Sequence, residues 1–191
     1  MKKLLIGSLI GAVLLFGWQA VAHMFMHHHD AAYKQVSNDA AVLTALSSSI
    51  QQEGQYMVPG VNTNASQEEM QKAEEAMKGK PWALITYHPV YESDMAMSSI
   101  RSFITALLCV MIFIGIIGTH QQSFAKVLLK ALGLGLLTWM LVWYNQNIWM
   151  QTPWDVLKGE GIDLLVGWGL VGLWLGWYLT SNARPSSKRY G

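Results

Sequence analysis

Histidine and methionine are concentrated between residues 23 and 30, which read His-Met-Phe-Met-His-His-His-Asp. If a helix continues through this stretch, His23 and His27 lie one turn apart on the same face, where two imidazoles can share a metal ion. Thioether with imidazole favours copper, whereas imidazole with the carboxylate of Asp30 favours zinc. The sequence therefore predicts a copper or zinc site. Its predicted ligands are His23, Met24, Met26, His27, His28 and, from further along the chain, His88.

The same cluster also fits two roles that need no copper or zinc. Histidine has an apolar ring edge and polar nitrogens, which suits the boundary between bilayer and water, and methionine is an ordinary apolar residue. A haem held by two histidines would need one ligand from the cluster and another from His88, because no histidine lies in the middle of an apolar run. The alternatives to a copper or zinc site are therefore the polar end of a membrane span and a haem site.

Sequence signatures of catalysis are scarce. The chain has no Gly-x-Ser-x-Gly, no His-Glu-x-x-His and no phosphate-binding glycine loop. Glu92 and Asp94 follow Tyr87 and His88 closely enough to form a general acid-base set, but no spacing rule supports that set. The single cysteine, Cys109, excludes a disulfide scaffold and a multi-cysteine metal cluster. We expect a protein that is not an enzyme.

The elements that must position these residues are membrane spans. Of the 191 residues, 52% are hydrophobic and only 13% are charged, which is about half the charged share of a soluble domain. The apolar residues form four runs long enough to cross a bilayer, namely Leu4 to Phe25, Ile100 to Thr119, Phe124 to Tyr144 and Gly161 to Thr180. The predicted fold is a mainly α membrane protein with four transmembrane helices and a small α+β extracytoplasmic segment between the first two.

Positive charges indicate the direction of these spans, because short cytoplasmic loops are rich in lysine and arginine. With a cytoplasmic N-terminus, the acidic residues lie outside and the inner pieces carry Lys2, Lys3, Lys126, Lys130, Arg184, Lys188 and Arg189. We therefore expect a multi-pass protein of the bacterial inner (plasma) membrane with both termini in the cytoplasm. The net charge of +1 and the lack of a basic patch with interleaved aromatic residues exclude nucleic acid as a partner.

The first run has two interpretations. A basic start and the residues Ala20-Val21-Ala22 suit a secretory signal cleaved after Ala22. The apolar stretch is also long enough to cross the bilayer. We expect an uncleaved signal anchor over residues 1–26, an extracytoplasmic segment over 27–99, three spans over 100–181 and a cytoplasmic tail over 182–191.

Charged and small residues within the spans bear on function. Charges occur only near the ends of the runs, which argues against a solitary transporter; these residues are Arg101, Lys126, Lys130 and Asp163. Glycine pairs at a spacing of four place both glycines on one helical face, where two backbones can approach closely. The predicted helix-packing residues are Gly7, Gly11, Gly172 and Gly176. Trp168 and Trp174 suit packing against a helix or a flat cofactor.

The segment between the first two runs has the signals of a small α+β unit. Asn38 or Ser37 can cap a helix, and Gly54 is placed to end it. Ser66 and Glu69 form a capping box at the start of a second helix, which should finish near Lys78-Gly79. Residues 55–58 and 82–87 read as strands that could pair. The expected order is helix, strand, helix, strand.

Two short motifs carry a resemblance. They are Glu53-Gly54-Gln55-Tyr56-Met57-Val58-Pro59 and Gly79-Lys80-Pro81-Trp82-Ala83-Leu84-Ile85-Thr86-Tyr87-His88-Pro89. Together with the histidine-rich end of the first span, they resemble a group of small bacterial inner-membrane proteins that have one N-terminal span and an external segment. The resemblance covers residues 18–100. It implies no activity and no catalytic residue, because no activity is known for that group.

The sequence favours a non-catalytic accessory or assembly subunit of a larger bacterial membrane complex, such as a respiratory or another energy-transducing complex. The small outer segment, the spans without buried charge and the glycine pairs all support this hypothesis. The expected partners are the lipid bilayer and other membrane-protein subunits. One alternative is copper or zinc handling on the periplasmic side through the cluster at residues 23–30. Another is a membrane enzyme acting on a lipid or envelope substrate.

Overall fold

The computed structural model describes residues 1–60, 62, 64–120 and 123–181 of the chain. These residues form two compact units. The first comprises Met1–Lys34 together with the described residues from Asp94 onward, and the second is Gln35–Ser93. The tail predicted for residues 182–191 lies outside the described residues, and so do residues 121–122 in the expected cytoplasmic turn.

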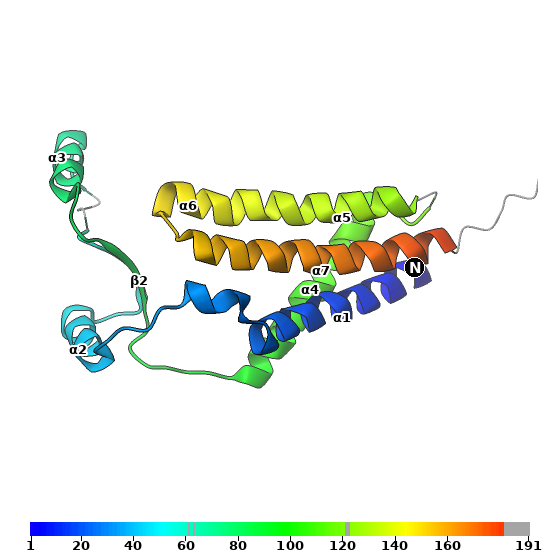
Figure 1. Cartoon of the computed structure of the whole chain (residues 1–191), viewed down its shortest axis with the longest axis horizontal. Helices are drawn as coiled ribbons and strands as arrows, with labels where there is room; N and C mark the ends of the chain where they lie inside the picture. Colours follow the sequence, from blue (N-terminus) through cyan, green and yellow to red (C-terminus); the bar gives the residue numbers. More distant parts are fainter. Residues whose placement is uncertain (61, 63, 121–122, 182–191) are drawn as a thin grey trace, which may run out of the picture. The chain divides into compact units, whose positions relative to one another are not determined.

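The first unit is built from long apolar helices (Figure 1). In the described part of the chain, four helical segments are long and apolar enough to cross a membrane, which confirms the expected number of candidate spans. They are α1 (Lys2–Phe25), α4 (Met95–Ile117), the segment Phe124–Met150 and α7 (Trp154–Ser181). The last begins seven residues before the predicted Gly161.

Local sequence determines where these helices begin and end. The carboxylate of Asp94 accepts a hydrogen bond of 2.9 Å from the amide of Met97 and so caps α4. Helix α4 ends before Gly118, which has a positive φ of 77° that glycine adopts without strain. The third segment runs from α5 (Phe124–Thr138) through one π-helical turn, η2 (Trp139–Tyr144), into α6 (Asn145–Met150).

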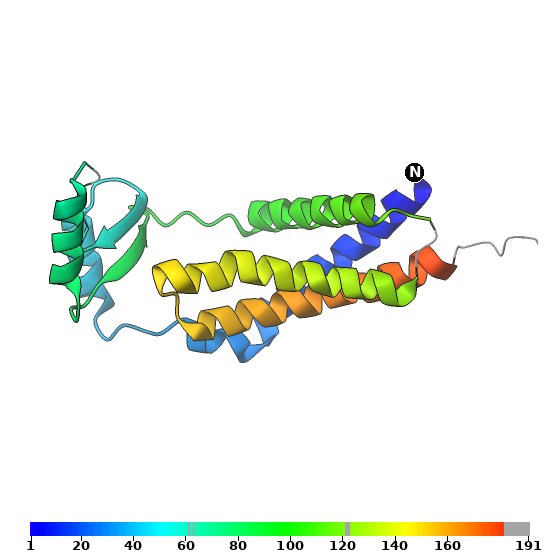
Figure 2. The same ribbon diagram turned by 90° about the horizontal axis from the view of Figure 1, so that it is seen from above.

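The long helices pack antiparallel, with α1 against α4 and α7, and α5 against α7 (Figures 1 and 2). A Cβ added to Gly11 would lie 2.8 Å from Val110 in α4, and one added to Gly172 would lie 2.8 Å from Ala131 in α5. The other two predicted helix-packing glycines have close neighbours too, Gly7 at Ile114 and Leu175, and Gly176 at Phe124. These four glycines therefore lie where helices of this chain approach one another.

The core of this unit is apolar. Phe113 and Trp168 make an edge-to-face contact at 5.3 Å between ring centroids. Trp174 stacks on Tyr178 and donates a hydrogen bond of 3.2 Å to the carbonyl of Gly7. Both indoles thus pack within the protein. The largest fully buried side chains are Val110, Ile114, Val127, Leu157, Val171, Leu175 and Leu179.

The second unit follows the expected order: α2 (Asp39–Ser49), β1 (Gly54–Val58), α3 (Gln67–Met77) and β2 (Ala83–Tyr87). The side chain of Asn38 caps α2, and the capping box of Ser66 and Glu69 opens α3. The two strands pair antiparallel, with Gly54 opposite Tyr87. Helix α2 ends at Ser49, not at Gly54, because Gly54 already belongs to β1.

Candidate metal centre

The histidine-rich stretch changes backbone conformation after the first span. Helix α1 ends at Phe25, and Met26 is extended with φ −103° and ψ 128°. A 3-10 helix, η1 (His27–Ala32), follows. The expectation that one helix carries His23 and His27 on the same face is therefore wrong. The exposed ring of His27 instead bonds to the neighbouring Asp30 through Nδ1, at 2.9 Å from Oδ2.

The change of direction carries the next two histidines to α7, where both meet one carboxylate. His28 donates from Nε2 to Oδ1 of Asp163, and His29 donates from Nε2 to Oδ2, each at 2.9 Å. The three side chains are only 14%, 11% and 9% exposed in the order His28, His29 and Asp163. A carboxylate buried to this degree requires such partners, because an unpaired charge away from water costs several kcal/mol.

His23, on the last turn of α1, completes the group. Its Nδ1 is 4.0 Å from Oδ2 of Asp163, too far for a hydrogen bond, and its ring is 4.6 Å from that of His29 between centroids. His23, His29 and Asp163 each offer a ligand atom, and these three atoms lie within 4.8 Å of one another. Among the described residues, no other group of three metal-ligating side chains is this close.

These distances suit a small divalent cation. Zinc binds nitrogen and oxygen at about 2.0–2.2 Å in a tetrahedron, so its ligand atoms are about 3.3 Å apart. The separations from Oδ2 of Asp163, 2.9 Å to His29 and 4.0 Å to His23, lie on either side of that value. An ion would draw His23 toward Asp163 and would take the place of the hydrogen bond between His29 and Asp163.

Neighbouring residues on α7 provide space and charge. Gly159 has no side chain, and a Cβ at that position would lie 2.7 Å from Nδ1 of His29. Glu160 is half-buried one turn before Asp163 and interacts electrostatically with His23, His28 and His29. The carboxylates of Glu160 and Asp163 give this end of α7 two acidic groups near the imidazoles.

A cavity of about 420 Å³ lies directly against two of the three ligands. Its walls are His23, Met26, His29, Asp30 and Tyr33. Met26, one of the two predicted thioether ligands, is in this wall. Met24, the other, is 73% exposed and is not part of it.

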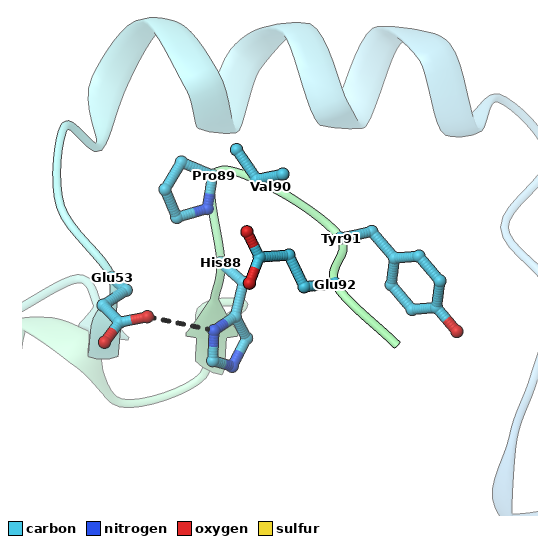
Figure 3. Close-up of a pocket in the computed structure, with 6 residues that line it drawn as sticks. All are labelled: Glu53, His88, Pro89, Val90, Tyr91 and Glu92. Atoms are coloured by element: carbon cyan, nitrogen blue, oxygen red, sulfur yellow. Dashed lines mark ion pairs between the residues drawn. The ribbon is translucent and has the colours of Figure 1, made fainter. Parts of the chain in front are cut away.

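His88 belongs to the second unit, where the strand register determines its neighbour. Because Gly54 pairs with Tyr87, the residues just outside the two strand ends, Glu53 and His88, come together at 3.4 Å between Oε2 and Nδ1. Both side chains are exposed and line a pocket of about 580 Å³ with Glu92 (Figure 3). The participation of His88 in the histidine cluster stays a prediction.

The acid-base set expected from the sequence is spread over different structural roles. Tyr87 is buried, and Asp94 is the capping residue of α4. Glu92 and His88 share the pocket of Figure 3.

The ligands His29 and Asp163 are not among those predicted from the sequence. The apolar run that predicts the fourth span begins at Gly161 and places Asp163 at its end, but α7 begins nine residues before Asp163 and buries it. One signal in the sequence could have identified Asp163 as a site residue: it is the only charged residue of the apolar run from Gly161 to Thr180. His29 has no distinguishing signal, because the helix end at Phe25 is marked by neither glycine nor proline.

In comparisons with known proteins, no family model, no curated protein and no solved structure matches the chain.

Proposed function

We propose that this protein binds a divalent transition-metal ion, zinc in the first place, at a centre formed by His23, His29 and Asp163. The observation that carries the proposal is the convergence of these side chains from three different elements, α1, η1 and α7, with ligand atoms within 4.8 Å. Ionisable groups buried in a membrane protein mark functional sites more often than structural ones. Two imidazoles with one carboxylate match the ligand types of zinc.

The same ligand set argues for zinc over copper(I). Copper(I) prefers thioether and thiolate ligands, and Asp163 supplies a hard carboxylate oxygen instead. His28 has the role of an outer-shell group, because its bond to Oδ1 orients the carboxylate. The ion would take the place of the proton that Nε2 of His29 donates to Oδ2, and that proton is released on binding. The proposed centre therefore keeps His23 from the sequence-based set and gains His29 and Asp163. It has neither His27 nor the thioethers of Met24 and Met26 as ligands, and His28 moves to the outer shell.

We further propose that the centre lies at the outer side of a bacterial inner membrane, with both ends of the chain in the cytoplasm. Support comes from the basic residues Lys2, Lys3, Lys126 and Lys130, which the antiparallel packing brings to the helix ends opposite the histidines. Short loops rich in lysine are typical of the cytoplasmic side. Labelling of cysteines introduced at Gly60 and Gln151, on intact cells, tests this orientation: external reagents should reach both.

The metal proposal is tested by the variant His23→Ala. His23 is 59% exposed and makes no hydrogen bond to Asp163, so its removal leaves the two imidazole–carboxylate bonds intact. We expect untagged wild-type protein in mild detergent to bind one zinc ion per chain by calorimetry and elemental analysis. We expect His23→Ala to bind zinc at least tenfold more weakly with an unchanged melting temperature.

The matched control is His27→Ala, four residues away in sequence. His27 is 89% exposed and contacts Asp30 instead of Asp163, so this variant should bind zinc like the wild type. Asp163→Asn, which removes the central charge, should lose binding altogether. Wild-type protein that takes up no metal, or equal affinities for the two histidine variants, would overturn the proposal.

A further inference from the structure

The proposed centre has three protein ligands, and two of them, His23 and His29, also line the cavity beside it. Neither His28 nor Glu160 belongs to the group of close ligand atoms, although both are near it. Tetrahedral sites with a structural role have four protein ligands, whereas sites with three keep one position for water or another molecule. The 420 Å³ cavity lies against His23 and His29 and is large enough for a small ligand.

We infer that the ion at this centre is exchangeable cargo, passed through the cavity to a small water-soluble chelator that carries carboxylate or imidazole donors. This inference rests on the proposed function. In the exchange step, the incoming donor displaces water at the fourth position and forms a ternary complex of protein, ion and chelator. The bonds from the ion to His23, His29 and Asp163 then break in turn, and no oxidant or reductant is needed.

The surroundings of the ligands support exchange over permanent retention. His23 is 59% exposed, so the ligand from α1 can leave the ion without disturbing the helix core. His29 and Asp163 are largely buried and hydrogen-bond to each other when no ion is bound, so both stay close to the position where the next ion would bind. The centre thus combines one accessible ligand with two fixed ones, and the accessible one borders the cavity.

Exchange through an open position has a kinetic signature. Protein loaded with cobalt(II), whose absorption reports tetrahedral coordination, is mixed with increasing nitrilotriacetate in mild detergent. We expect the rate of cobalt loss to rise linearly with chelator concentration, because the chelator takes part in the step. A rate independent of chelator concentration would show that the ion must first leave a closed site, and would overturn the inference.

A pair of methionine variants locates the route. Met26→Phe places a bulkier ring in the cavity wall and should lower the slope of rate against nitrilotriacetate at least threefold, with cobalt affinity unchanged within twofold. Met24→Phe is the control, because Met24 is exposed and outside the cavity wall; its slope should equal that of the wild type. A tenfold loss of cobalt affinity in Met26→Phe would mean that the thioether fills the fourth position, which also overturns the inference.

The outcomes separate this inference from the proposed function. If the wild type binds neither cobalt nor zinc, the proposed function fails and the inference fails with it. If cobalt binds and His23→Ala weakens it, but exchange is independent of nitrilotriacetate, the proposed function stands and only the inference fails.

Discussion

Replacing Gly159 by alanine is expected to weaken zinc binding while leaving the fold intact. A Cβ on this glycine lies 2.7 Å from Nδ1 and 2.9 Å from Cε1 of His29, whereas ordinary contacts begin at 3.4 Å. The imidazole must therefore retreat by the difference, about 0.7 Å, which exceeds the tolerance of roughly 0.2 Å on metal–ligand distances. Without metal, the ring can turn into the adjoining cavity and relieve the contact. This gives up the hydrogen bond from His29 to Asp163, but the bond from His28 to the same carboxylate stays.

The metal-free state therefore loses one hydrogen bond, whereas the metal-bound state is destabilised more because His29 must stay beside the ion. Overpacking of one methyl group costs about 1–3 kcal/mol, which corresponds to a loss of roughly 5- to 150-fold in affinity. Zinc titration calorimetry on the untagged, detergent-solubilised full chain measures this loss of affinity. A melting curve without zinc checks that the variant is folded. The expected result is weaker binding with a melting temperature close to that of the wild type.

A second glycine of α7 gives the matched control. A Cβ on Gly169 would lie 3.5 Å from Cδ2 of Leu132, an ordinary contact. Gly169→Ala should therefore bind zinc within twofold of the wild type. If Gly159→Ala binds zinc as tightly as Gly169→Ala, His29 does not hold the ion in the position that the structure gives it, and the reasoning is refuted.

Three further predictions concern the outer shell, the helix contacts and the second unit. His28→Ala should weaken zinc binding by about 10- to 100-fold in calorimetry, because Asp163 loses the bond that orients its carboxylate. Gly172→Leu should lower the yield and melting temperature of the protein in detergent, since even a Cβ there lies 2.8 Å from helix α5; an unaltered melting temperature would contradict this. Hydrogen bonds from the amide and the hydroxyl of Ser66 lower the pKa of Glu69, so the capping box is fully formed at neutral pH and is lost as the pH falls through that lowered pKa. The protection factor for amide hydrogen exchange in the first turn of α3, which corrects for the intrinsic pH dependence of exchange, should then fall on acidification in the wild type. In Ser66→Ala it should be low at neutral and at acidic pH alike.

The elements of the fold were predictable because each has a local signal. Long apolar runs specify membrane-length helices, and the capping box at Ser66 specifies the start of α3 regardless of tertiary contacts. The sequence predicted that the two strands could pair. It did not predict their register, which depends on contacts between residues about thirty positions apart, such as Gly54 and Tyr87. Helix boundaries were less accurate, because α7 begins in the polar stretch that starts at Trp154.

The metal centre was predictable only in part. The sequence indicated the correct neighbourhood, since His23 and the residues after it are the ones that meet α7. It could not supply the partner, because Asp163 lies 134 positions from His29 and no local spacing rule relates the two. It also favoured His27 over His29, because a continuous helix is expected where the backbone instead becomes extended at Met26.

The accessory-subunit hypothesis loses two of its supports in the structure. Its glycine pairs pack against helices of the same chain, so they no longer point to a partner. Its spans were expected to lack buried charge, yet Asp163 is 8% exposed.

The alternative to a metal centre is a purely structural role for the histidine cluster. In that role, the hydrogen bonds from His28 and His29 to Asp163 hold η1 against α7. In a docking role His23 contributes only its ring contact with His29, and its Nδ1, at 4.0 Å from the carboxylate, has no hydrogen-bond partner in Asp163. A metal ion would give Nδ1 of His23 a partner, so the two roles predict different zinc affinities for His23→Ala. A loss of stability in Asp163→Asn would not distinguish them, because both roles predict it.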